Sequence, residues 1–347
     1  SLAIIPVLLL IICSETDSPK LNETVGIPHS LASKIDNEKP LIEVTTHISD
    51  NYVSEDDLAS YNGESLSSIK LSGQEPACII FTGGTTGSPK GALLSHLNLC
   101  TGALNGVYVK DKTMHLRYMA IIPFVHIFGL VRNLLSCVMT GSNLYLVKEV
   151  PQFVKDIRKF KPQIMVLVPA LANLIYSLVA QGGKAAVGGE LDYIISGGAN
   201  VPAELIQRLG TVGINCLPGY GLTETASLVS GNGDWKRIPS SVGCPYPNQE
   251  LKVVNGELWV KGDHVFLGYY NDEVETNKVL ENGWLKTGDL VKFDEDGFLY
   301  IVGRCKNILI LDNGENVSPA EVENYFNAID VVQDSLVFEE ELENLQI

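Results

Sequence analysis

The residue types best suited to chemistry in this sequence are concentrated in one loop, residues 81–91. The loop contains four glycines, three threonines, one serine and Lys90. Glycine lets backbone N–H groups turn toward a ligand, hydroxyl groups add donors, and the lysine adds a point charge, a combination that suits a polyphosphate. Pro89 stands where the common P-loop has its second glycine. For this loop taken alone, a glycine-rich connection without a ligand is therefore the alternative.

Three further segments carry polar side chains or glycines directly after apolar runs. They are residues 123–129 with His126, residues 196–199, and residues 219–226 with Glu224. Each has a structural explanation when it is taken singly. A histidine within an aromatic run is usually a satisfied core residue, a Ser-Gly-Gly-Ala segment is a strand end and turn, and a glutamate after a turn is usually solvated. Asp289, farther along, could simply close a turn.

The elements that must position these loops are short apolar runs alternating with longer helical stretches. Strands are expected at 77–81, 118–123, 144–147, 164–168, 193–196 and 214–217, and Ser95 is placed to cap a helix after the first loop. Such alternation predicts βαβ units and a mostly parallel sheet, whose ligands collect beyond the carboxyl ends of the strands. The loops singled out above fall at those ends.

The texture of the sequence changes after about residue 230. Shorter strand-like runs at 251–254, 256–260, 290–293 and 298–302 are joined by Asn-Gly and Asp-Glu-Asp-Gly turns. They predict a small antiparallel sheet or barrel beside the larger domain. Near the N-terminus, one strand is expected around 41–45. The first thirteen residues are apolar but lack the positive region and cleavage site of a signal peptide and are too short to span a bilayer, so a buried strand is expected.

Composition excludes several classes of partner. The 347 residues allow two or three domains, and 45% of them are apolar, enough for large cores. The formal net charge is −16 and no run of lysine or arginine occurs, which argues against nucleic acid and anionic membrane surfaces as partners. No transmembrane segment is expected. The seven cysteines are odd in number and dispersed, without metal-ligand spacing. A reducing, cytoplasmic location is expected.

Taken together, the motifs across residues 77–323 closely resemble, in order, those of the adenylate-forming (AMP-binding) superfamily of acyl-CoA synthetases and ligases. Long-chain fatty-acid–CoA ligases are the most similar branch. The resemblance implies that Lys90, His126, Thr223 and Glu224 have catalytic roles, with His126 lining the acyl pocket, Thr223 near the α-phosphate and Glu224 on Mg²⁺. It assigns the phosphate loop to Thr82, Gly83, Gly84, Thr85, Thr86, Gly87 and Lys90.

The same resemblance assigns the rest of the nucleotide site. Backbone at Gly197, Gly198 and Ala199 would pack against adenine, and Tyr220, between Gly219 and Gly221, would stack on it. Asp289 would hold the ribose hydroxyls, Arg304 would reach ribose or phosphate, and Lys306 would be the hinge to a mobile lid. Residues 313–323 resemble the loop that moves in the second half-reaction, and Ser318-Pro319 with Glu321 also fits an ordinary helix start.

The fold class expected is α/β. A large domain with a doubly wound, mostly parallel sheet would be followed by a small antiparallel β-barrel-like subdomain and the start of a truncated α+β C-terminal lid. The expected boundaries are 1–228, 229–303 and 304–347. No lysine or arginine follows Lys306, so the lid lysine of the family has no counterpart, and the segment before the phosphate loop is short. We therefore expect a lid-less chain with reduced turnover.

The function that this resemblance implies is ATP-dependent activation of a carboxylic acid to an acyl-AMP, with release of pyrophosphate, and then thioester formation with coenzyme A. The cofactors would be ATP/AMP, Mg²⁺ and coenzyme A. Residues 123–129 contain no aspartate to pair a substrate ammonium, so an uncharged acyl tail, a fatty acid, is favoured over an amino acid. Two alternatives remain: an adenylation domain that loads the phosphopantetheine of an acyl carrier protein, and a non-catalytic nucleotide-binding module.

Overall fold

The computed structural model describes residues 10–12, 44–45, 72–82, 89–106, 115–147, 150–233, 238–307, 309–310 and 316–317, together with seven isolated residues between 319 and 337. Residues 83–88, most of the glycine-rich loop, lie outside the described residues. No helix in the part of the chain that is described is both long and apolar enough to cross a membrane.

An eight-stranded sheet in the order β11-β10-β9-β8-β7-β5-β6-β2 forms the centre of the molecule. Its parallel strands are β2 (Val44–Thr45), β6 (Asn143–Leu146), β5 (Arg117–Ala120), β7 (Ile164–Leu167), β8 (Tyr193–Ser196) and β9 (Asn215–Tyr220), followed by antiparallel β10 (Ser230–Gly231) and β11 (Cys244–Pro245). All four residues of β7 are buried, the continuous apolar pattern of a strand covered on both faces. The parallel sheet expected from the sequence is confirmed.

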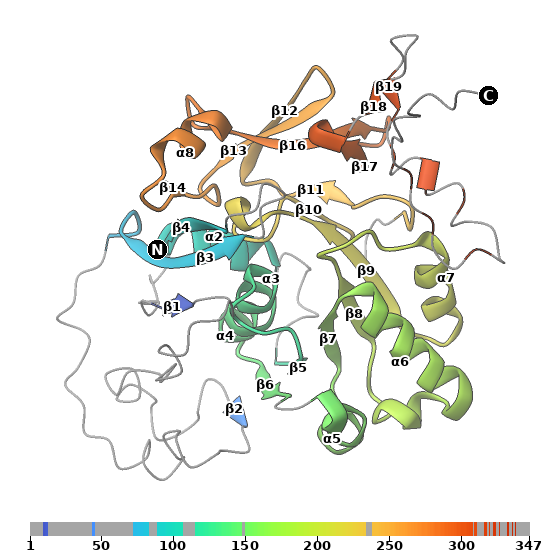
Figure 1. The fold of residues 1–347 in the computed structure, drawn as a ribbon. Helices are drawn as coiled ribbons and strands as arrows, with labels where there is room; N and C mark the ends of the chain where they lie inside the picture. The colour runs from blue at the N-terminus through green and yellow to red at the C-terminus, as the bar shows by residue number, and fades with distance from the viewer. Residues whose placement is uncertain are drawn as a thin grey trace, which may run out of the picture.

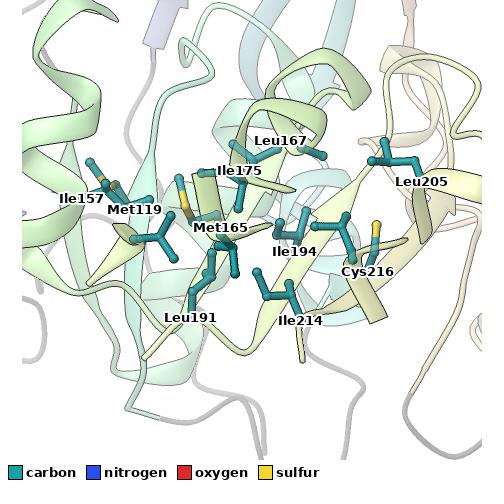
Figure 2. Close-up of a cluster of buried hydrophobic side chains, with 14 of the residues drawn as sticks. Met119, Ile157, Met165, Leu167, Ile175, Leu191, Ile194, Leu205, Ile214 and Cys216 are labelled. Carbon is teal, nitrogen blue, oxygen red and sulfur yellow. The ribbon is translucent and has the colours of Figure 1, made fainter. Parts of the chain in front are cut away.

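Helices cover both faces of this sheet, as Figure 1 shows. On one face lie α5 (Phe153–Phe160), α6 (Pro169–Gly182) and α7 (Ala203–Thr211), whose apolar side chains meet those of the strands in the core of Figure 2. Against the other face lies the continuous helical run α3 (Ile127–Gly129), η3 (Leu130–Leu135) and α4 (Ser136–Thr140). Short 3-10 turns, η4 (Val150–Gln152) and η5 (Lys184–Val187), flank α5 and α6. The doubly wound arrangement is thereby confirmed.

The strand before the glycine-rich loop differs from the expectation. β3 (Pro76–Thr82) is not in the parallel sheet, and its loop does not lead directly into a helix. Instead the chain returns as β4 (Lys90–Ser95), antiparallel to β3, in a separate sheet of order β1-β3-β4-β14 that includes β1 (Leu10–Ile12) and β14 (Gly268–Tyr269). The apolar run after Lys90 extends the hairpin because its residues pair with β3 before any helix begins.

The helix after this hairpin, α2 (His96–Gly106), begins where the sequence predicts. The Ser95 hydroxyl accepts a hydrogen bond from Asn98 N at 3.1 Å, and the Asn98 side chain accepts one from Ser95 N at 2.7 Å. This reciprocal pair satisfies two backbone donors at the start of the helix. Ser95 is the expected cap.

The expected small antiparallel sheet is confirmed, with an open five-stranded ladder. It contains β12 (Gln249–Val254), β13 (Glu257–Gly262), β15 (Leu280–Glu281), β16 (Trp284–Phe293) and β17 (Leu299–Arg304), beside α8 (Glu273–Val279). Leu258, Val260, Val291 and Leu299 form its buried side. Beyond it lie η7 (Cys305–Asn307), β18 (Leu309–Ile310) and β19 (Asn316–Val317). The helix start expected at Ser318-Pro319 lies largely outside the described residues, and the three domain boundaries stay a proposal.

Candidate active site

Three of the loops singled out by the sequence lie at the carboxyl ends of parallel strands of the central sheet. The loop with His126 follows β5, Gly197 to Ala199 follow β8, and Gly219 and Tyr220 end β9. A Cβ added at Gly197 would lie 3.4 Å from both the Gly219 carbonyl oxygen and the Phe128 ring. These segments therefore lie close together, with Gly197 buried and Gly198 exposed.

Asp289 connects two other residues that the sequence proposes for the nucleotide. The Tyr220 hydroxyl donates to Asp289 Oδ2 at 2.6 Å, and Arg304 Nε donates to Asp289 Oδ1 at 2.6 Å. Asp289 is 4% exposed, whereas half of the Arg304 side chain is in solvent. Burial and the Asp289 carboxylate raise the pKa of Tyr220 well above its usual value, so its hydroxyl stays a donor. Both Asp289 oxygens are thus held in fixed directions.

The turn that presents Asp289 is itself fixed by side chains. Gly288 has a φ of +72°, a conformation in which a side chain would be strained. Its N–H donates to Glu257 Oε1 at 2.8 Å. The Thr287 hydroxyl donates to the Leu258 carbonyl at 2.8 Å and accepts from Asp289 N at 3.1 Å. The segment Thr287-Gly288-Asp289 therefore forms a bend in β16 and also fixes the position of the aspartate.

A second group of contacts links Lys90 to Glu224 through Tyr269. The Tyr269 hydroxyl donates to Glu224 Oε1 at 2.6 Å, and Lys90 Nζ lies 5.2 Å from the centre of the Tyr269 ring. Lys90 also forms an ion pair with Glu275 of α8. Burial, followed by the charge of Glu224, raises the pKa of Tyr269 above its usual value, which keeps this phenol protonated as well.

Glu224 belongs to the 3-10 turn η6 (Thr223–Thr225), directly after β9. The turn is followed by Ala226 and Ser227, both with positive φ, at 45° and 84°. Such backbone persists in non-glycine residues only where the surroundings impose it. Here Gly221 allows the close approach, because a Cβ added to it would lie 2.0 Å from the Ser227 carbonyl oxygen. The two groups of contacts therefore share one short segment, from Tyr220 to Glu224.

The donor set around Glu224 fits a magnesium ion bound together with phosphate. One carboxylate oxygen accepts from Tyr269, and the other forms no hydrogen bond or ion pair with a residue in the described ranges. No group of three His, Cys, Asp or Glu side chains in those ranges could hold a metal ion alone. A single hard carboxylate, completed by phosphate oxygens and water, is a usual arrangement for Mg²⁺.

His126 is the N-cap of α3, where its Nδ1 accepts from Phe128 N at 3.2 Å. The side chain remains exposed, and partial desolvation of the ring lowers its pKa. Directly after α3 the chain forms six residues of π-helix, η3, a rare element that is frequent at functional sites. His126 therefore lies at the N-terminal end of the helical run that covers the sheet.

The remaining expected residues are placed as follows. Thr82 ends β3 and its hydroxyl donates to the Lys90 carbonyl at 3.3 Å. Gly83, Gly84, Thr85, Thr86 and Gly87 lie outside the described residues. Thr223 opens η6 and is half-buried, and Lys306 is exposed in η7.

Sequence reasoning missed Tyr269 and Glu275. Both lie far along the chain from their partners, 45 residues from Glu224 and 185 from Lys90 respectively. β14 pairs with β4, with Tyr269 opposite Ala92, and this pairing brings Tyr269 close to Lys90. No local sequence pattern marks Tyr269, because its position depends on the pairing of β14 with β4, a tertiary interaction.

Comparison with known proteins identifies one enzyme family. Residues 7–270 match the family model described as AMP-binding enzyme. The chain is 32% identical over 283 residues to a long-chain-fatty-acid–CoA ligase of Bacillus subtilis, covering 75% of this chain and 49% of that protein. It is 35% identical over 295 residues to the ligase of the same name from Escherichia coli O6:H1, covering 77% and 51%. The chain spans about half the length of the curated relatives that it matches.

Solved structures show the same fold. ATP-bound MatB from Rhodopseudomonas palustris superposes with a TM-score of 0.71 at 28% identity, covering 81% of this chain and 58% of that one. The O-succinylbenzoate coenzyme A synthetase MenE from Bacillus subtilis, in complex with AMP, gives a TM-score of 0.69 at 25% identity, covering 91% and 69%. The anthranilate CoA ligase AuaEII, in complex with anthranoyl-AMP, gives 0.72 at 24% identity, covering 84% and 59%, a likeness of fold alone.

Proposed function

Because the chain belongs to the AMP-binding enzyme family, we propose that it activates a carboxylic acid with ATP and passes the acyl group to the thiol of coenzyme A. In the first step a substrate carboxylate oxygen attacks the α-phosphorus, forming an acyl-AMP while the bond to pyrophosphate breaks. In the second step the thiol displaces AMP from the acyl carbon.

The observation that carries this proposal is the short segment 220–224, in which the two groups of contacts meet. It joins a buried carboxylate suited to ribose hydroxyls, Asp289, to a carboxylate suited to a metal–phosphate complex, Glu224, and onward to the phosphate-loop lysine, Lys90. A nucleotide needs these three kinds of group in this order, from ribose to the terminal phosphates. A structural network would not need a free carboxylate oxygen on Glu224.

The residues would act mainly by positioning and by neutralising charge. Lys90 would exchange Glu275 for phosphate oxygens, and Asp289 would accept from the ribose hydroxyls while Arg304 holds it in place. Magnesium, when bound at Glu224, supplies positive charge to the phosphate oxygens. His126, at the N-terminal end of the helical run, would separate the acyl substrate from solvent.

We propose a fatty acid as the substrate class. The curated relatives are named long-chain-fatty-acid–CoA ligases, and residues 123–129 contain no carboxylate to pair an ammonium group. The structural relatives named for anthranilate and O-succinylbenzoate make aryl acids the second class to test. Coenzyme A is proposed over a carrier protein because the same relatives are coenzyme A ligases.

The test is carboxylate-dependent ATP–pyrophosphate exchange by the full-length gene product, with fatty, aryl and amino acids. Exchange strongest with fatty acids supports the proposal, and exchange with amino acids alone contradicts the substrate class. Glu224→Gln should reduce exchange at least tenfold, because one displaced charge in a transition state of this kind is worth several kcal/mol. Glu204→Gln, an exposed change on α7, is the matched control and should leave the rate unchanged.

A further inference from the structure

Arg132 of η3 is a buried cation without an anionic partner in the described part of the chain. It is 4% exposed, and no other lysine or arginine of the described residues is buried. Its one hydrogen bond runs from Nη1 to the Ser136 hydroxyl at 3.1 Å, and its Nε has no partner. The buried carboxylate Asp289, by contrast, has Arg304 beside it. Burying an unpaired charge is costly, so an explanation is needed.

Two unpaired amides follow Arg132 in the chain or precede Gly106, the residue of α2 against which Arg132 lies. Asn133, the following residue, is fully buried, and both polar atoms of its side chain lack a partner. The same is true of Asn105, 1% exposed, on the last turn of α2. Arg132 packs onto Gly106, the residue after Asn105, since a Cβ added to Gly106 would lie 1.7 Å from Arg132 Nη1. Native proteins leave few buried polar atoms unsatisfied, so each such group calls for a structural or functional explanation.

This cluster lies deeper on the same helical run that begins at the active site. Phe128, one turn before Arg132, contacts Gly197 and Gly198 beside the proposed adenine site. Residues four apart share a helix face, although the π-helical turn shifts that register. Arg132 is also close enough to Tyr118 of β5 and to Tyr246 to oppose the rise in their pKa values that burial causes. The guanidinium therefore lies between the helical run, α2 and the central sheet.

We infer that Arg132, with Asn105 and Asn133, binds a carboxylate at the far end of the acyl substrate, so that the preferred acid is a dicarboxylic one. This inference rests on the proposed acid activation and narrows its substrate. A planar guanidinium matches a carboxylate through paired N–H donors, and each amide offers a further donor. The distal charge of the substrate would offset the buried cation, and the plain fatty acid would leave it unpaired.

A purely structural role for Arg132 makes a different prediction. The carbonyl ends of α2 carry partial negative charge, and Arg132 lies against the last residue of that helix. If this alone holds the guanidinium, replacing it changes stability and affects all acids equally. The ratio of rates with dicarboxylic and monocarboxylic acids therefore separates the two roles, because a structural change leaves that ratio constant.

The experiment measures kcat/KM for ATP–pyrophosphate exchange by the full-length gene product. Chain-matched pairs are compared: octanoate with octanedioate and dodecanoate with dodecanedioate, plus the monomethyl ester of each diacid. The wild type should prefer one diacid over its monoacid and ester by at least tenfold. Arg132→Met should abolish that preference, with a loss for the diacid of about tenfold to a hundredfold, the range for a hydrogen bond to a charged group. Arg132→Lys should retain part of it.

Arg208→Met, which removes an exposed arginine lying over the Tyr176 ring, is the matched control and should leave the ratio unchanged. Asn133→Ala provides a second variant should Arg132→Met fail to fold, and it should lower the preference several-fold. A wild type that uses monoacids as well as diacids, or an Arg132→Met variant with an unchanged ratio, overturns the inference and leaves the proposed function standing. Absence of exchange with every acid, with ATP still bound, overturns both.

Discussion

Replacing Asp289 by alanine should destabilise the folded chain by about 2–4 kcal/mol in the absence of any ligand. Asp289 is 4% exposed and each of its oxygens accepts one hydrogen bond at 2.6 Å, from Tyr220 and from Arg304. The substitution removes both acceptors at once. Its cost depends on how well each former donor can then be solvated.

The two donors should contribute unequally. The Tyr220 hydroxyl loses a hydrogen bond to a charged group, worth about 1.5–3 kcal/mol. The Arg304 side chain is 51% exposed, so water replaces the carboxylate, and the loss is below about 1 kcal/mol. Asp289→Asn keeps the shape of the side chain and one acceptor, so it should cost about half as much as alanine.

Equilibrium unfolding in urea, followed by tryptophan fluorescence, measures these values. Double-mutant cycles with Tyr220→Phe and Arg304→Gln then separate the two interactions. The coupling of Asp289 to Tyr220 should exceed its coupling to Arg304. An Asp289→Ala variant within about 1 kcal/mol of the wild type, or a larger coupling to Arg304, would refute the reasoning from burial.

Three further outcomes are expected. Tyr269→Phe keeps the ring near Lys90 but removes the hydrogen bond to Glu224. The Mg²⁺ concentration needed for half-maximal ATP binding should therefore rise severalfold in calorimetric titrations. An unchanged concentration would contradict the assigned contact. Burial lowers the pKa of His264 to about 4, so the unfolded chain takes up a proton at a higher pH than the folded chain does. The free energy of unfolding should therefore fall by about 3 kcal/mol as the pH falls from 6.5 to 4. His264→Leu should flatten this pH dependence in urea unfolding at several pH values. In α2, Gly102→Ala should destabilise by about 1–3 kcal/mol despite better helix propensity, because the new Cβ would lie 2.3 Å from a backbone carbonyl oxygen. Gly210→Ala in α7, where nothing lies within 4 Å, should stabilise by up to about 1 kcal/mol and serves as its control.

The parallel sheet could be predicted because its strands are buried on both faces. Runs such as that of β7 are apolar throughout, and they alternate with stretches long enough for a helix. The hairpin of β3 and β4 could not be predicted in the same way. The five residues after Lys90 form a short apolar run, which periodicity alone cannot assign to strand or helix. Pairing with β3, a tertiary interaction, decided the outcome.

The candidate site was predictable residue by residue but not as a network. Lys90, Glu224 and Asp289 each stand out as polar groups after apolar runs, and the family resemblance assigned their roles. What joins Lys90 to Glu224 is Tyr269, an aromatic residue in a short strand whose partner β4 lies far away in the sequence. No local pattern distinguishes such a tyrosine from a core residue. Arg132 escaped attention for a similar reason, since a lone arginine in an apolar helix gives no hint that it is buried.

The geometry also separates the permanent partner of Lys90 from the exchangeable one. Glu275 and Lys90 are both partly exposed, at 24% and 19%, and Glu275 already has Lys278 as a second partner, so the polyphosphate of a nucleotide can take Lys90 from it at little cost. Tyr269 is different, because its hydroxyl is committed to Glu224 and its backbone N–H to the Thr276 hydroxyl at 2.8 Å. If Lys90 exchanges Glu275 for phosphate as proposed, the Tyr269 ring should stay in place. We therefore propose that Tyr269, rather than Glu275, keeps Lys90 and Glu224 in register when a nucleotide binds.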